Sequence, residues 1–230
     1  MRALTWNIRH GGTSRVEAIL AAVQAHAPDL VVLTEFRNNT AGQRLREALA
    51  SLGLRHQSRA HDQVTVNTVW VAARKAFVEQ TFDILGIDVH RCVLARMGDV
   101  NVFGLYFPNL KKKEPLFRFL VDLAPQYLAE PTLLFGDFNT GKHHLDEAGA
   151  TFFCADYLER LESLGWVDAW RRQHAEAREY TWYSYRGNGF RLDHAFVSPP
   201  LWLRVQRVFY SHREREQKVS DHSALVVDIE

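Results

Sequence analysis

The sequence predicts an α/β fold in one domain, and three observations carry this prediction. Short apolar runs typical of buried strands alternate along the chain with segments whose apolar residues recur at helical spacing. No low-complexity linker interrupts the alternation, so we predict a single domain over residues 1–230. The 230 residues are 47% hydrophobic and 24% charged, the composition of an ordinary soluble globular protein with a sizeable core.

The first half of the chain begins with a predicted strand at residues 3–7, which runs into a polar, glycine-bearing turn at 9–12. A helix is expected from Ser14, because Glu17 follows three residues later as in a capping box, and Pro28 ends it. Further predicted elements are strands at 30–33, 69–73 and 100–106 and a helix carrying Leu45, Leu49 and Leu52.

The second half continues the same pattern. We predict helices over residues 116–128 and around Leu158, Leu161 and Leu164, and strands at 132–135, 191–197, 205–209 and 224–229.

Composition excludes several classes of protein. Lys and Arg number 28 against 27 for Asp and Glu, which excludes a histone-like polycation but leaves room for a local basic patch. The two cysteines, Cys92 and Cys154, indicate neither a disulfide framework nor a zinc site. No apolar run is long enough for a transmembrane helix and the N-terminus lacks a signal-peptide core, so we predict a cytoplasmic enzyme without membrane contact.

Several apolar strands end in a polar residue able to hold a metal or a proton, namely Asn7, Glu35 and Asp137. Chemistry in α/β folds collects where strand ends converge. Glu35 beside Asn7 offers hard oxygen ligands suited to Mg²⁺ or Mn²⁺. The alternative is that strands end in polar residues simply because loops are wet.

Two short segments carry candidate proton-transfer groups. In GDFN at 136–139, alternation places Asp137 and Asn139 on one side of the chain, although an Asx turn would use the same residues. In SDHS at 220–223, Asp221 and His222 point to opposite faces, so Asp193 of RLDH at 191–194 is the better partner for His222. A surface or structural histidine is the alternative.

Two further segments are candidates for substrate contact. Tyr106 and Asn109 stand at the end of a strand, and three lysines follow from Lys111. Together these side chains could form a surface that faces phosphate. The alternative is that the lysines are simply a solvated run. The aromatic and basic stretch YTWYSYR at 180–186 suits stacking on sugars or bases, but for Trp182 we expect core packing.

In this order, six segments resemble the endonuclease/exonuclease/phosphatase superfamily. They are TWNI at 5–8, LTE at 33–35, YFPN at 106–109, GDFN at 136–139, RLD at 191–193 and SDH at 220–222. The exonuclease III-like, apurinic/apyrimidinic (AP) endonuclease branch is most similar, through YFPN, GWVDAWR at 165–171, the GFRLD stretch at 189–193, and Asp146 at the place of a supporting aspartate.

The resemblance implies a DNase I-like four-layer sandwich, with two mixed sheets face to face and helices outside. It implies a phosphodiesterase dependent on Mg²⁺ or Mn²⁺, with nucleic acid, most simply DNA, as the partner and no obligate protein partner. The implied metal ligands are Glu35, Asn7 and Asp221. The implied catalytic residues are Asp137, Asn139, His222, Asp193 and Tyr106, and Asn109 is an implied phosphate contact. Arg9 and Lys111 are further candidates for phosphate contact because they are basic.

Two departures from the family pattern concern substrate choice. Arg9 stands where a small polar or acidic residue is usual, and NTVW at 67–70 replaces a glycine-rich stretch. Two alternatives therefore stay open: hydrolysis of a small or lipid phosphate ester, and a non-catalytic nucleic-acid-binding domain. A nuclease predicts a basic rim built from residues such as Arg9, residues 111–113, Lys142 and Arg186.

Overall fold

Two six-stranded β-sheets form the centre of the molecule, described by a computed structural model of residues 1–230. The first sheet has the order β13 (Val205–Ser211), β14 (Ala224–Ile229), β1 (Arg2–Asn7), β2 (Leu30–Phe36), β4 (Thr68–Ala73), β3 (His56–Gln57). The second has the order β5 (Val78–Thr81), β6 (Cys92–Met97), β7 (Val100–Tyr106), β8 (Thr132–Asp137), β12 (Asp193–Val197), β9 (Val167–Asp168). Both sheets are mixed, because β1 pairs with β2 and β7 with β8 in parallel while their other neighbours are antiparallel.

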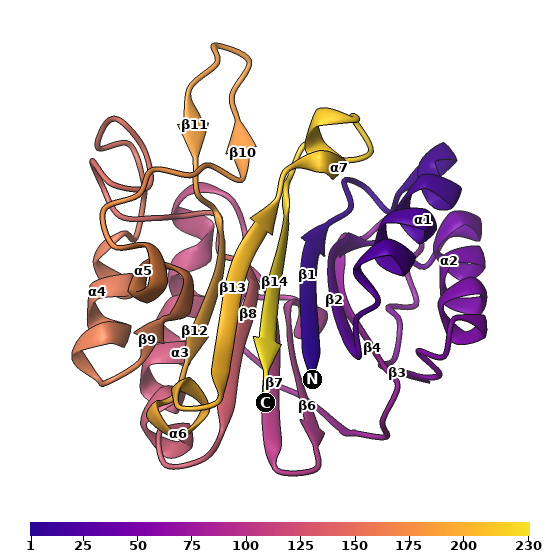
Figure 1. Ribbon diagram of the computed structural model, residues 1–230, viewed down its shortest axis with the longest axis horizontal. Helices are drawn as coiled ribbons and strands as arrows, with labels where there is room; N and C mark the ends of the chain where they lie inside the picture. The colour runs from indigo at the N-terminus through magenta and orange to yellow at the C-terminus, as the bar shows by residue number, and fades with distance from the viewer.

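Helices cover the outer face of each sheet (Figure 1). On the first sheet lie α1 (Val16–His26) and α2 (Thr40–Ser51), and on the second lie α3 (Glu114–Leu123) and α4 (Asp156–Ser163). Shorter helices are α5 (Ala169–His174), α6 (Pro199–Trp202) and α7 (Arg213–Glu216). The four layers confirm the predicted sandwich. No helix combines the length and the apolar character needed to cross a bilayer.

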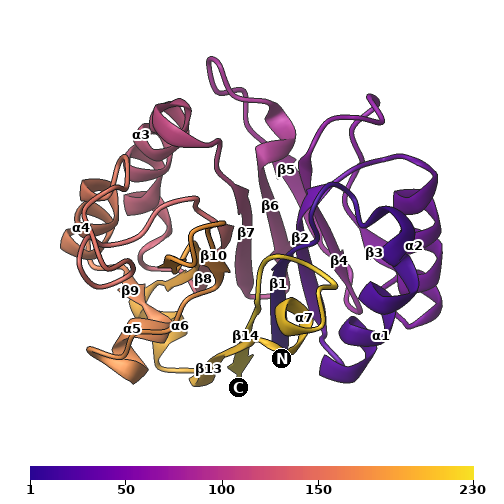
Figure 2. The same cartoon turned by 90° about the horizontal axis from the view of Figure 1, so that it is seen from above.

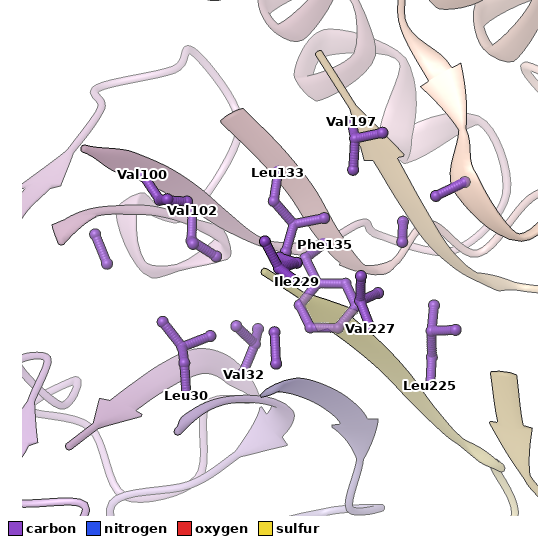
Figure 3. Close-up of a cluster of buried hydrophobic side chains, with 14 of the residues drawn as sticks. Leu30, Val32, Val100, Val102, Leu133, Phe135, Val197, Leu225, Val227 and Ile229 are labelled. Carbon is purple, nitrogen blue, oxygen red and sulfur yellow. The ribbon is translucent and has the colours of Figure 1, made fainter. Parts of the chain in front are cut away.

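The core between the sheets explains the unbroken apolar runs of the central strands. In β2, Leu30 and Val32 pack between the sheets, whereas Val31 and Leu33 pack against the helices. Figure 3 shows Val32 opposite side chains of the second sheet such as Phe135. Because both faces of these strands are buried, both sets of alternate positions must be apolar.

The termini of two predicted helices are wrong. Ser14 does not cap a helix: it lies inside a 3₁₀ turn (Thr13–Arg15), and Arg15 occupies the N-cap of α1 without a side-chain hydrogen bond. The helix predicted over 116–128 ends at Leu123, where Pro125 has no N–H to continue the ladder and a 3₁₀ turn (Ala124–Tyr127) follows. Strand β6, which the sequence analysis did not identify, lies beside β7.

The polar ends of the central strands meet at one edge of the two sheets. Asn7 is the neighbour of Thr34, Tyr106 pairs with Asp137, and Asp137 pairs with Asp193. Above this edge project a small hairpin of β10 (Trp182–Tyr183) and β11 (Gly189–Phe190) and the loop that carries α7 (Figures 1 and 2).

Candidate active site

A cavity of about 520 Å³ opens at this edge and collects most of the predicted site residues. The polar and charged side chains that line it are Glu35, Asn109, Lys113, Asp137, Asn139, Thr151, Asp221 and His222. Its apolar wall consists of Leu110, Phe152, Phe153, Trp182, Phe190 and Leu192.

Asp137 lies at the end of β8, where the backbone requires glycine before it. Gly136 has φ of 153°, and a Cβ there would lie 1.9 Å from the carbonyl oxygen of Leu105. Asp137 accepts hydrogen bonds from Asn7 Nδ2 at 2.9 Å and from the Asn139 amide at 2.9 Å. Burial raises the pKa of Asp137 to about 7, which suits proton transfer near neutral pH.

Asn139 serves both the turn and the site. The backbone N–H of Asn139 donates to Asp137 Oδ1, and this hydrogen bond closes an Asx turn. The φ angle of Asn139 is 50°, in the left-handed region. Its side-chain Nδ2 donates to the carbonyl of Phe107 at 2.8 Å and lies 3.4 Å from Asp137 Oδ2. The turn and the catalytic interpretation of GDFN are therefore compatible.

His222 is paired with Asp193, as the sequence analysis predicted. His222 Nδ1 lies 2.9 Å from Asp193 Oδ2, and both side chains are buried. Burial alone would lower the pKa of His222, but the Asp193 carboxylate more than offsets it and raises that pKa to about 10. The imidazolium form then holds positive charge beside the cavity.

Glu35 accepts hydrogen bonds from four donors in three segments of the chain. Its Oε1 accepts from Asn7 Nδ2 at 3.2 Å and from the Tyr106 hydroxyl at 3.3 Å. Its Oε2 accepts from the His10 amide at 2.8 Å and from Asn67 Nδ2 at 3.1 Å. These contacts fix the direction in which the carboxylate faces the cavity.

The donor set fits a divalent cation. Glu35 and Asp221 both line the cavity, and Asp193 Oδ1 is a buried carboxylate oxygen with no hydrogen-bond partner. The ligand atoms of Asp137, Asp193 and His222 lie within 4.8 Å of one another, so two carboxylates and the imidazole converge on one point. Carboxylate oxygens without thiolates suit a hard ion.

Asn7 bridges the two acidic centres rather than offering a free oxygen. Its Nδ2 faces both Glu35 and Asp137, and its Oδ1 accepts the amide of Arg9 at 2.9 Å. A metal-ligand role for Asn7 stays a prediction.

The basic residues are distributed differently from the predicted rim. Lys113 is 2% exposed and donates to the carbonyl of Asn139, and burial lowers the pKa of Lys113 to about 8. Lys142 forms an ion pair with Glu162 at 2.6 Å, so its charge is already neutralised within the protein. Lys111 is exposed, with its ammonium 5.7 Å from the centre of the Phe153 ring. Arg9 is exposed and lies outside this cavity.

The prediction of core packing for Trp182 is wrong. Core packing was expected, but the ring is half-buried, lines the cavity, and donates Nε1–H to Asp221 Oδ2 at 3.3 Å. The indole N–H needs a polar partner, and the site supplies one.

The sequence did not indicate a site role for His10 or Asn67, and it did not distinguish Lys113 from the other two lysines at 111–113. Asn67 precedes β4, which is antiparallel to β2, so the start of β4 lies beside the end of β2. A search for polar residues just before predicted strands, as well as at their ends, would have identified Asn67.

This fold and this cluster of carboxylates, amides and a paired histidine define a metal-assisted hydrolase of phosphate esters. The chain belongs to the Endonuclease/Exonuclease/phosphatase family, whose profile it matches over residues 4–222. The three activities in that description share the hydrolysis of phosphate esters. No relative was found among curated proteins.

Solved structures share the fold over the whole chain. The 3′-5′ exonuclease NExo from Neisseria meningitidis is 24% identical, with a TM-score of 0.87 and 100% of both chains covered. NExo from Neisseria described as a 3′ phosphatase and bound to product DNA hairpin is 24% identical, with a TM-score of 0.85 and coverage of 100% of this chain and 99% of that one. An AP endonuclease from Archaeoglobus fulgidus is 21% identical, with the same TM-score of 0.85 and coverage of 100% and 99%.

Proposed function

We propose that this chain is a Mg²⁺- or Mn²⁺-dependent DNA hydrolase of the exonuclease and AP-endonuclease type. The observation that carries the proposal is the position of Asp137, whose pKa is about 7, beside the Asp193–His222 pair at the floor of one cavity. A proton acceptor and a buried imidazolium then face the same phosphate.

Each group has a distinct role in the proposed reaction. Asp137 accepts a proton from the attacking water, while its bonds to Asn7 and Asn139 hold it in place. The imidazolium of His222, kept by Asp193, stabilises charge on the phosphoryl oxygens. The new P–O bond forms as the bond to the leaving oxygen breaks, and that oxygen takes a proton from solvent.

The remaining predicted residues act on binding. A divalent ion held by Glu35 and Asp221 would supply positive charge to the phosphoryl group. Asn109 lines the cavity and donates hydrogen bonds to phosphate oxygens. Tyr106 acts through Glu35, because its hydroxyl donates to Glu35 Oε1 at 3.3 Å. Lys111 contributes at longer range from its exposed position.

The apolar wall favours a nucleotide over a simple phosphate ester. Trp182, Phe190 and Leu192 present ring and aliphatic surface next to the acidic floor, which suits the deoxyribose or base attached to the reacting phosphate. The DNA-bound 3′ phosphatase and the AP endonuclease with the same fold support DNA as the substrate.

A second candidate activity is release of phosphate from 3′ ends, and Lys113 favours it. A terminal phosphate carries more negative charge than a diester. Lys113 is buried in the cavity without a carboxylate partner, so it can match that extra charge.

A panel assay tests the proposal. Labelled abasic, nicked, single-stranded, 3′-phosphorylated and RNA substrates are incubated with Mg²⁺, Mn²⁺ or a chelator, next to a small ester such as p-nitrophenyl phosphate. Metal-dependent cleavage of DNA is expected. Hydrolysis of the small ester with every DNA left intact would contradict the DNA assignment.

The predicted cytoplasmic location stays a prediction.

A further inference from the structure

A second, basic cavity of about 260 Å³ lies beside the catalytic one. Six residues line it: Arg9, Tyr183, Arg215, Lys218, Ser220 and Asp221. None of its three cationic side chains forms an ion pair, so three positive charges face the cavity against one carboxylate. That carboxylate, Asp221, is shared with the catalytic cavity and accepts the indole N–H of Trp182.

The two loops that form this cavity are tied together. Arg15 donates to the carbonyls of Arg9, at 2.6 Å, and of Val219. The hydroxyl of Ser220 donates to the carbonyl of Asn7 at 2.6 Å. The backbones that carry Arg9 and Lys218 are therefore held in a fixed relation before any ligand binds.

Arg215 is positioned by a hydrogen-bonded chain of three side chains. His212 Nε2 lies 2.8 Å from Glu179 Oε1 and therefore carries the proton, which leaves Nδ1 to accept from the Ser223 hydroxyl at 2.7 Å. The Ser223 oxygen in turn accepts Arg215 Nε–H at 3.1 Å. The guanidinium carbon lies 4.6 Å from the centre of the Tyr183 ring, and the hydrogen bond to Ser223 uses Nε, so the two terminal nitrogens are available to a ligand.

One residue step separates the two cavities. Trp182 and Tyr183 are adjacent in β10, and adjacent strand residues point to opposite faces. Trp182 therefore lines the catalytic cavity while Tyr183 lines the basic one. Asp221 lines both cavities, so the two are contiguous.

We propose that the basic cavity binds a second backbone phosphate of the same nucleic-acid strand whose ester is hydrolysed. This inference rests on the proposed function and adds to it that the substrate is an oligonucleotide rather than a mononucleotide. The ligand is an anion because no carboxylate of the protein forms an ion pair with these three cations. The contact is independent of base sequence, because Arg215 covers the ring of Tyr183 and the remaining side chains match phosphate oxygens.

Binding of modified oligonucleotides to the intact protein tests the proposal. Fluorescent 3′-phosphorylated DNA hairpins are prepared with one neutral methylphosphonate at each successive linkage from the 3′ end, and Kd is measured by anisotropy in EDTA. Arg215→Gln and Lys218→Gln are compared with the parent and with Lys75→Gln. Lys218 and Lys75 are both exposed, and Lys75 follows the end of β4 that lies away from Asn67.

We expect one linkage at which the methylphosphonate weakens binding to the parent about tenfold. In Arg215→Gln and Lys218→Gln that penalty should shrink, whereas Lys75→Gln should behave as the parent. Equal affinity for every modified hairpin, or an unchanged penalty in both variants, would overturn the second phosphate site. Parallel assays of 3′-phosphate release keep the two proposals separate: binding with the expected pattern but no hydrolysis refutes the proposed function alone, and hydrolysis without the pattern refutes the basic cavity alone.

Discussion

The first prediction concerns Arg191, a buried residue that binds two carboxylates close to the active site. Arg191 is fully buried and donates to Asp146 at 2.7 and 3.0 Å and to Asp168 at 2.6 and 3.2 Å. Burial alone would raise the pKa of both carboxyls, but Arg191 holds them below their ordinary value. Two residues after Arg191 stands Asp193, the partner of His222.

Replacing Arg191 by Met removes the charge at similar volume. Asp146 keeps its ion pair with Arg171 at 2.5 Å. Asp168 keeps the backbone N–H of Arg171 at 3.1 Å and His194 at 3.8 Å, but this buried carboxylate loses its guanidinium counter-ion. Breaking a buried ion pair in this way costs about 3–5 kcal/mol. For a chain of this size that lowers Tm by about 6–20 °C.

The pH dependence identifies the cause. In the parent the folded pKa of each carboxyl is depressed, so its stabilisation is present above the unfolded pKa of about 4 and is lost only as pH falls below that. In Arg191→Met the unpaired carboxyl has a raised folded pKa, so the native state takes up a proton as pH falls. The stability gap between parent and variant should therefore be wider at pH 8 than at pH 5.

Urea unfolding followed by tryptophan fluorescence at pH 5, 6.5 and 8 measures this gap. Arg172→Met is the matched control, because Arg172 is exposed on α5, whose N-cap is Asp168, and makes no ion pair. A loss below about 1 kcal/mol, or a gap that does not change with pH, would refute the electrostatic explanation.

Four further outcomes concern activity on a 3′-phosphorylated or abasic DNA. Asp137→Asn should lower kcat by about 10²–10⁴-fold without lowering Tm, and full activity would refute the proton-transfer role. Asp193→Asn should return the pKa of His222 from about 10 to 6.5 or below, so that kcat at pH 8 falls by about 30-fold or more from loss of the imidazolium alone; an unchanged pH profile would contradict this. Because the pKa of Lys113 is about 8, KM for 3′-phosphate ends should rise as the ammonium deprotonates above pH 8, and Lys113→Met should lack that rise. A chelator should abolish turnover, and Glu35→Ala should need at least about tenfold more Mg²⁺ for half-maximal rate; an identical metal titration argues against Glu35 as a ligand.

Several features of the site followed from the sequence because they depend on local pattern. Strand period and the polar residues at strand ends placed Asp137 and Tyr106 at one edge, and the structure pairs them across β7 and β8. The pairing of His222 with Asp193 followed from the same alternation, which turns adjacent Asp221 away. These positions are set by a few residues on either side, so one sequence suffices to predict them.

Tertiary structure alone decided burial, charge pairing and the surroundings of each group. Asn7 bonds to Asp137 across 130 residues of sequence, and nothing near Asn7 in the chain indicates that contact. Lys113 looks like its exposed neighbour Lys111 in the sequence, yet packing buries it in the cavity. The physical reason is that desolvation and Coulomb interactions depend on which distant segments meet, and only the packed sheets bring those segments together.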